Sequence, residues 1–209
     1  MIALFKKYCI VASLVLGGCA TMNQSECLNA NWRMIGLEDG SNGRELSHIG
    51  NHRKACAEFN ISPDLEQYQL GHTQGLRQYC TYNKGFQQGS HGNTYKSICP
   101  PDLVGDFRFG HQRGREVYAL SLELNRTQSS IKEIHELLEE LTAEALSKED
   151  LIISRKTREA DRALLLVDIK EIQTEIGRLE VELELLEQQE ADIAYERNRL
   201  KQRYQAGPE

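Results

Sequence analysis

The feature that most constrains the fold is a heptad pattern that fills the C-terminal part of the chain. Between Ala119 and Ala206 there is no proline, and the only glycine is Gly177. The heptad positions recur at steps of three and four, with two final steps of seven, in two sets: Val117, Leu120, Leu124, Thr127, Ile131, Ile134, Leu138, Leu141, Ala145, and then Leu165, Ile169, Ile172, Ile176, Leu179, Leu183, Leu186, Ile193, Leu200. A repeat of about 3.5 residues over many turns indicates coiled-coil packing of α-helices. We therefore expect an all-α protein.

The two apolar sets differ in phase, and the slip between them falls near Ser147. Ser147 is followed three residues later by Asp150, a spacing that resembles the capping box at a helix start. This predicts a turn near Ser147 and an antiparallel hairpin, which would place Glu139 near Arg155. One unbroken rod with a stutter is the alternative.

Composition separates the hairpin from the residues before it. The range 19–118 contains twelve glycines, whereas 119–209 contains two and carries 21 acidic against 13 basic residues. We expect a glycine- and cysteine-rich helical module at 19–118 and an acidic coiled coil at 119–206. The formal net charge of −6 lacks the basic footprint of a nucleic-acid-binding protein. A basic cluster, expected to be a solvated helix face or a patch for an acidic partner, consists of Arg155, Lys156, Arg158 and Arg162.

The first residues have the layout of a bacterial export signal. Lys6 and Lys7 precede a short apolar run that is too short to span a bilayer, so residues 1–18 are expected to be a signal peptide. The following residues, Leu16-Gly17-Gly18-Cys19, resemble a lipobox, which makes Cys19 the predicted lipid attachment site. Because Ala20 follows instead of an aspartate, we expect an outer-membrane lipoprotein facing the periplasm.

Four cysteines remain in the predicted mature chain beyond Cys19: Cys27, Cys56, Cys80 and Cys99. An even set in an exported protein predicts two disulfides. The pairs Cys27–Cys56 and Cys80–Cys99 are favoured because they close two separate loops. Free thiols and a zinc site are the alternatives, although no C-x-x-C pair is present.

Glycines and aromatic residues recur together at helical spacing. The three copies are Tyr68-Gly71-Gly75-Tyr79, Tyr82-Gly85-Gly89 and Phe107-Gly110-Gly114-Tyr118. A glycine inside a helix costs about 1 kcal/mol relative to alanine, so the pattern requires a compensating gain. Close helix packing is the favoured explanation. The alternative is a ligand face for an envelope glycan, made of Tyr68, Gly71, Gly75, Tyr79, Tyr82, Gly85, Gly89 and Phe107.

Candidate catalytic and metal-binding residues lie near a glycine-rich stretch that is predicted to be a turn, Gly36 to Gly43. Glu38 and Asp39 within it could act as an acid–base pair, with His48 nearby. His48 and His52 are four residues apart and could bind a metal with His72, His91 or His111. No acidic or cysteine ligand has matching spacing, so we expect no metal and no cofactor. Adjacent acidic residues on a tight turn more often cap a helix or bond the amides of the turn, so we expect no catalytic site.

Several of these residues carry a family resemblance. Trp32, Gly36, Asp39 and Gly40 form a W-x-x-x-G-x-x-D-G motif, which the ordered glycines and the cysteines Cys80 and Cys99 follow. Over about residues 19–122 the chain resembles the bacterial lipoprotein family DUF2799, a domain of unknown function. The resemblance implies a bond between Cys80 and Cys99 and no activity. Asn31 stands where the family usually has an aspartate.

Taken together, these patterns predict a non-catalytic, lipid-anchored protein of the cell envelope. The coiled coil is expected to self-associate or to contact an envelope protein, and the membrane is expected to be reached through the lipid on Cys19. Binding of peptidoglycan or another envelope glycan is the second hypothesis. An envelope hydrolase built on Glu38, Asp39 and His48 is the third.

Overall fold

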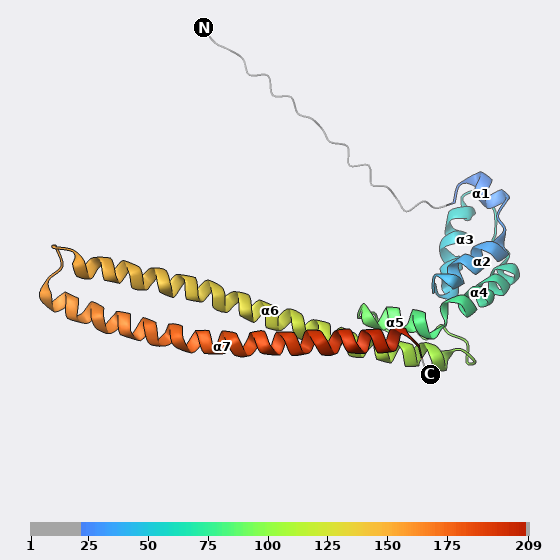
Figure 1. Ribbon diagram of the computed structural model, residues 1–209. Helices are drawn as coiled ribbons and strands as arrows, with labels where there is room; N and C mark the ends of the chain where they lie inside the picture. The colour runs from blue at the N-terminus through green and yellow to red at the C-terminus, as the bar shows by residue number, and fades with distance from the viewer. Residues whose placement is uncertain (1–21, 208–209) are drawn as a thin grey trace, which may run out of the picture. The chain divides into compact units, whose positions relative to one another are not determined.

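The computed structural model describes residues 22–207, which are all-helical apart from turns and loops. Its elements (Figure 1) are α1 (Gln24–Leu28), α2 (Trp32–Ser41), the short 3₁₀ helix η1 (Leu46–His48), α3 (Ile49–Ala57), α4 (Leu65–Tyr79), α5 (Tyr82–Ser90), α6 (Val104–Ile153) and α7 (Glu159–Gln205). The chain forms two compact units, the first ending at Tyr79 and the second beginning at Cys80. The predicted signal peptide and Cys19 lie outside the described residues.

The first unit is built around a disulfide and a small apolar core. Cys27 and Cys56 are bonded, which confirms the predicted pair and joins α1 to α3. The core around this bond contains Trp32, Ile49 and Tyr68. Before Trp32, the side chain of Asn31 accepts a hydrogen bond from the Met34 amide at 3.1 Å. Asparagine and aspartate cap helices equally well, so the departure from the family's aspartate keeps the start of α2 intact.

Helices α2 and α4 cross with their backbones in contact. The four glycines at the crossing are Gly36, Gly40, Gly71 and Gly75. A Cβ on Gly71 would overlap the carbonyl oxygen of Arg33, and one on Gly36 would overlap that of Tyr68. The expected turn from Gly36 to Gly43 is therefore wrong, because Gly36 and Gly40 belong to α2. The turn follows Ser41, where Gly43 adopts a φ of 69° beneath the ring of Tyr79.

The second unit repeats this crossing with α5 and the first turns of α6. The glycines Gly36, Gly40 and Gly43 recur in the same spacing as Gly85, Gly89 and Gly92; Gly71, Gly75 and Tyr79 recur as Gly110, Gly114 and Tyr118. The contacts recur too, since Gly110 lies against the Tyr82 carbonyl as Gly71 lies against that of Arg33. Cys80 and Cys99 form the second disulfide, confirming that pair as well.

Beyond the crossing, α6 continues and forms an antiparallel hairpin with α7 (Figure 1). The hairpin is confirmed, but the predicted turn near Ser147 and the boundary at residue 118 are wrong, because α6 is unbroken from Val104 to Ile153. Around Ser147 the helix is held by Lys148, whose Nζ lies 2.9 Å from Asp168 and 3.4 Å from Glu144. The composition change near residue 118 marks only the point in α6 where its glycine-mediated crossing with α5 ends.

The turn of the hairpin lies between α6 and α7, at residues 154–158. The Thr157 hydroxyl closes it by donating to the Leu151 carbonyl at 2.6 Å. Two contacts show the register of α6 against α7. Lys148 donates a hydrogen bond to Asp168, and Gln128 donates one to Glu190 at 2.7 Å. The expected pairing of Glu139 with Arg155 is wrong, since Arg155 lies in the turn.

The last turns of α7 return to the glycine crossing of the second unit. The Tyr82 hydroxyl donates to the Tyr204 carbonyl at 3.0 Å. The Tyr204 hydroxyl donates to Glu116 at 2.8 Å and accepts from Arg113 at 3.2 Å. The Arg113 guanidinium also lies over the rings of Phe109 and Tyr204. The hairpin is thus fastened at its open end to the crossing of α5 and α6.

Candidate functional site

Asp39 is the centre of a polar cluster in the first unit. It lies on α2 between Gly36 and Gly40, in the stretch where that helix presses against α4. Its side chain is only 14% exposed. The close crossing therefore holds this carboxylate in a fixed position inside the unit.

Two neighbouring helices donate hydrogen bonds to the same oxygen of Asp39. His52 on α3 donates from Nε2 to Asp39 Oδ2 at 2.8 Å. The hydroxyl of Tyr68, from α4, donates to this oxygen at 2.8 Å as well. Burial, together with the hydrogen bond to Asp39, raises the pKa of Tyr68, so its hydroxyl keeps the proton that it donates.

His48 approaches the other oxygen of Asp39 without bonding to it. The distance from His48 Nε2 to Asp39 Oδ1 is 3.9 Å, too long for a hydrogen bond. The opposite ring nitrogen, Nδ1, lies 3.1 Å from the side-chain amide of Asn51. The His48 and His52 rings stand nearly perpendicular, with their centroids 5.4 Å apart. The potential ligand atoms of Asp39, His48 and His52 lie within 4.8 Å of one another.

The other histidines proposed as metal ligands point elsewhere. His72 donates to the Arg44 carbonyl at 2.8 Å, and its counterpart in the repeat, His111, donates to the Asn93 carbonyl at 2.8 Å. His91, which directly follows α5, donates to the Gln87 carbonyl in that helix. Thus the histidine pair is completed by Asp39, an acidic residue that local spacing in the sequence did not connect to it. Glu38, the expected acid–base partner of Asp39, is exposed and outside the cluster.

The suggested ligand face is occupied by neighbouring helices. Its glycines contact helix backbones, while the rings of Tyr68 and Phe107 are buried. Tyr79 covers Gly43, and Tyr82 bonds to the end of α7. The close helix packing in these contacts compensates for the free-energy cost of placing glycine inside a helix.

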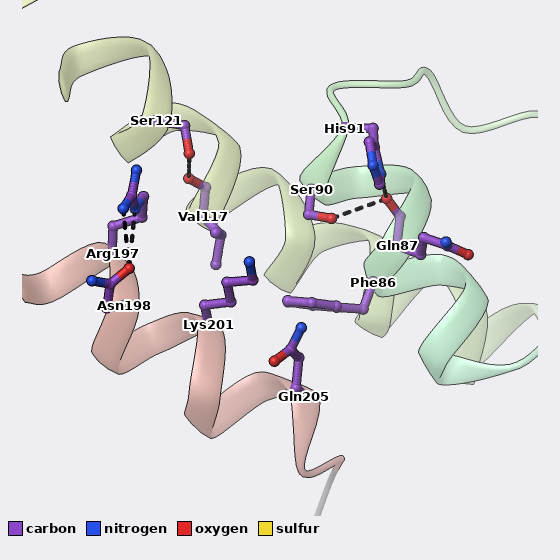
Figure 2. Close-up of a pocket in the computed structure, with 10 residues that line it drawn as sticks. All are labelled: Phe86, Gln87, Ser90, His91, Val117, Ser121, Arg197, Asn198, Lys201 and Gln205. Carbon is purple, nitrogen blue, oxygen red and sulfur yellow. Dashed lines mark hydrogen bonds between the residues drawn. The ribbon is translucent and has the colours of Figure 1, made fainter. Parts of the chain in front are cut away.

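A groove in the second unit forms a second candidate binding surface. It measures about 440 Å³ and lies between α5, α6 and α7. Figure 2 shows Lys201 and Gln205 of α7 facing Phe86 of α5. Arg197 lies on the same side and bonds only to Asn198, and within residues 22–207 neither Arg197 nor Lys201 forms an ion pair. Local sequence spacing does not indicate this groove, because its α7 residues follow its α5 residues by more than a hundred positions in the chain.

These observations define a small, disulfide-stabilised all-α protein with two glycine crossings, the second of which continues into a helical hairpin. Residues 31–116 match the model of the family described as "Protein of unknown function (DUF2799)", and the chain carries a domain of this family there. The matched range begins at the Asn31 cap and ends just after Gly114, so it covers both crossings and excludes most of the hairpin. No curated protein and no solved structure matches the chain. Within residues 22–207, no helix combines the length and apolarity needed to cross a membrane.

Proposed function

We propose that this protein is a non-catalytic, lipid-anchored scaffold of the cell envelope whose hairpin pairs with the hairpin of a second copy. The lipobox at Cys19 supports the anchor, and the export signal together with Ala20 supports an outer-membrane location facing the periplasm. The observation that carries the pairing is a row of exposed apolar side chains on α7.

This row lies on the side of α7 away from the hairpin seam. The buried seam residues include Ile169, Leu179 and Ile193. The outward residues, with their exposed fractions, are Leu164 (67%), Val167 (54%), Val181 (60%), Leu185 (62%) and Tyr195 (71%). They fall at the outer positions of the heptad, which a two-stranded coil ordinarily fills with polar residues. An apolar row at heptad spacing on an outer face favours contact with another helix.

The row is complementary to itself in an antiparallel arrangement. If a two-fold axis passes beside Thr174, Val167 of one copy faces Val181 of the other, and Leu164 faces Leu185. The same register sets Glu171 opposite Arg178. Isologous contacts of this kind close a dimer with two-fold symmetry.

Charge favours the same arrangement. The turn at residues 155–158 contributes three basic side chains, whereas six acidic residues and no basic ones lie between Leu179 and Tyr195: Glu180, Glu182, Glu184, Glu187, Glu190 and Asp192. In the register centred on Thr174, the basic turn of each copy comes opposite the end of the acidic stretch of the other, at Glu190 and Asp192. A parallel arrangement would set like charges together, which is unfavourable.

Cysteine crosslinking tests this register directly. Thr174→Cys should form a disulfide between two copies under mild oxidation, because the symmetry axis brings the two positions together. Val181→Cys should not crosslink to itself, since its copies would lie about 21 Å apart along the helix, yet it should crosslink to a Val167→Cys chain. Strong self-crosslinking of Val181→Cys with none for Thr174→Cys would contradict the antiparallel pair.

The lipid anchor has its own test. Cys19→Ser should abolish palmitate labelling in cells and release the protein from the membrane fraction, while the crosslinking of Thr174→Cys persists in the released form. Continued labelling of Cys19→Ser would contradict the proposed attachment site.

The groove of Figure 2 supports envelope-glycan binding as a second candidate function. Arg197 and Lys201 form no ion pair with another residue of the range 22–207 and lie beside the apolar Phe86, which suits a carboxylate-bearing ligand such as a peptidoglycan stem peptide. A Lys201→Ala variant should then lose retention on isolated sacculi, with Arg203→Ala, outside the groove, as the control. Equal retention of both variants would contradict this function.

A further inference from the structure

We propose that Asp39, His48 and His52 form a binding site for a divalent transition-metal ion of the zinc type. The site goes beyond the scaffold function and does not depend on dimerisation. Three different elements supply its ligands: α2 carries Asp39, η1 carries His48 and α3 carries His52.

The spacing of the donor atoms suits one small ion. Zinc binds imidazole nitrogen and carboxylate oxygen at about 2.0–2.2 Å, so two ligands of a tetrahedral site lie about 3.3 Å apart. His52 Nε2 and Asp39 Oδ2 are 2.8 Å apart, and His48 Nε2 and Asp39 Oδ1 are 3.9 Å apart. These distances bracket the tetrahedral value, so small side-chain rotations bring all three groups onto one ion. The Nε2 proton that His52 donates to Asp39 moves to Nδ1 through solvent when the ion binds, which frees the Nε2 lone pair.

The donor chemistry selects the class of metal. Two imidazoles and one carboxylate suit zinc and its neighbours among the late transition metals, whereas calcium and magnesium prefer oxygen ligands throughout. Three protein ligands leave a fourth position open. Tyr68, hydrogen-bonded to Asp39 at 2.8 Å, orients the carboxylate from behind.

His48 is the group whose arrangement points most directly to an ion. Its Nε2 faces the Asp39 carboxylate, but within residues 22–207 it has no hydrogen bond there. Its Nδ1 lies beside the Asn51 side-chain amide, which can instead present its oxygen to an Nδ1 proton. In that tautomer the Nε2 lone pair points toward the ion. A metal-bound histidine usually donates its other ring N–H to a nearby acceptor, as Nδ1 would here to Asn51.

The surroundings keep the site both rigid and reachable. Glycines on either side of Asp39 lock α2 against α4, and the Cys27–Cys56 bond ties down α3, which carries His52. The side chains of His48 and His52 are 26% and 19% exposed, so an ion can enter from solvent. A site of this kind requires little ordering when it binds its ion.

Trp32 provides a local optical probe. It is the only tryptophan in the chain, and its ring lies edge-on to His52 with the centroids 6.3 Å apart. The experiment uses the full chain without a polyhistidine tag and with both disulfides intact. Calorimetric titration with zinc should give one equivalent per chain, and copper or nickel ions should quench Trp32 fluorescence. Calcium and magnesium should do neither.

Variants separate the site from adventitious binding. His48→Gln should weaken zinc binding by about tenfold or more while leaving helical circular dichroism unchanged, because His48 is partly exposed and outside the apolar core. Asp39→Asn, which keeps an acceptor for Tyr68, should weaken binding similarly. His135→Gln, on the exposed face of α6, is the matched control and should bind like wild type.

Two results would overturn the site. One is the absence of zinc binding and of fluorescence quenching in the folded wild-type chain at millimolar metal. The other is zinc affinity and stoichiometry in folded His48→Gln and Asp39→Asn equal to those of wild type, which would place any bound ion elsewhere.

Discussion

Gly75 of α4 lies against the carbonyl oxygen of Leu37 in α2, with no room for a Cβ between them. In the second unit Gly114 lies in the same way against the carbonyl oxygen of Phe86. Because the backbone contacts, the turn glycines and the covering tyrosines all recur, the two crossings are two copies of one helix-pair design. The match to the DUF2799 model covers both copies, so the pair of crossings is the part of this chain that resembles that domain.

Gly71→Ala should destabilise the first unit. The added methyl group overlaps the Arg33 carbonyl, a backbone atom that cannot move aside, so the expected loss is about 1–3 kcal/mol in the free energy of unfolding. Gly50→Ala is the control, since nothing lies within 4 Å of its Cβ position and alanine favours the helix. Denaturant unfolding measures both. A Gly71→Ala variant as stable as Gly50→Ala would contradict the close crossing.

Removal of the first disulfide should weaken its own unit selectively. A Cys27→Ser, Cys56→Ser double variant is expected to lose about 2–4 kcal/mol, since the bond closes a loop with a sequence separation of 29. Amide hydrogen exchange should rise in α1 to α4 and stay unchanged in the hairpin. Equal acceleration throughout the chain would show that the two units unfold together.

Tyr204→Phe should loosen the attachment of the hairpin to the α5–α6 crossing. The change removes two hydrogen bonds of the Tyr204 hydroxyl, one donated to Glu116 and one accepted from Arg113, each of which contributes about 0.5–1.5 kcal/mol to stability. The ring stays under the Arg113 guanidinium. Hydrogen exchange should accelerate in the last turns of α7. Tyr195→Phe, which alters an exposed ring, serves as the control. Unchanged protection at the end of α7 would contradict the attachment.

The stability of α7 should decrease as the pH falls. Hydrogen bonds from Arg178 and Arg199 lower the pKa values of Glu175 and Glu196. The ionised carboxylates therefore stabilise the folded state above their unfolded pKa of about 4.3, and this contribution disappears as pH falls through the lower folded values. The melting temperature should drop on acidification below about pH 4.5.

The effect of acid is expected to be small because all four side chains are solvent-exposed. In an Arg178→Gln, Arg199→Gln double variant, the melting temperature should decline less steeply as pH falls. Thermal unfolding monitored by circular dichroism measures this decline. A decline as steep as that of the wild type would assign the acid sensitivity to other groups.

The disulfides and the hairpin could be predicted because their evidence is local or periodic. Cys27 pairs with Cys56, and Cys80 with Cys99, each within one stretch of chain, and the heptads are visible without knowing the partner helix. The turn could not be placed. The residues around Ser147 suit an exposed helix surface as well as a helix start, and packing against α7, including the Lys148–Asp168 contact, favours the continuous helix.

The sequence by itself determined the helical class, because an uninterrupted heptad pattern is stable only as packed helices, and it determined the separate disulfide loops. Tertiary structure alone decided the role of Gly36 and Gly40, since glycine permits both a turn and a close crossing and the approach of α4 selects the second. Tertiary structure also determined which side chains surround Asp39. Carboxylate, imidazole and phenol groups meet there from four elements, α2, η1, α3 and α4, and their proximity depends on how those elements pack.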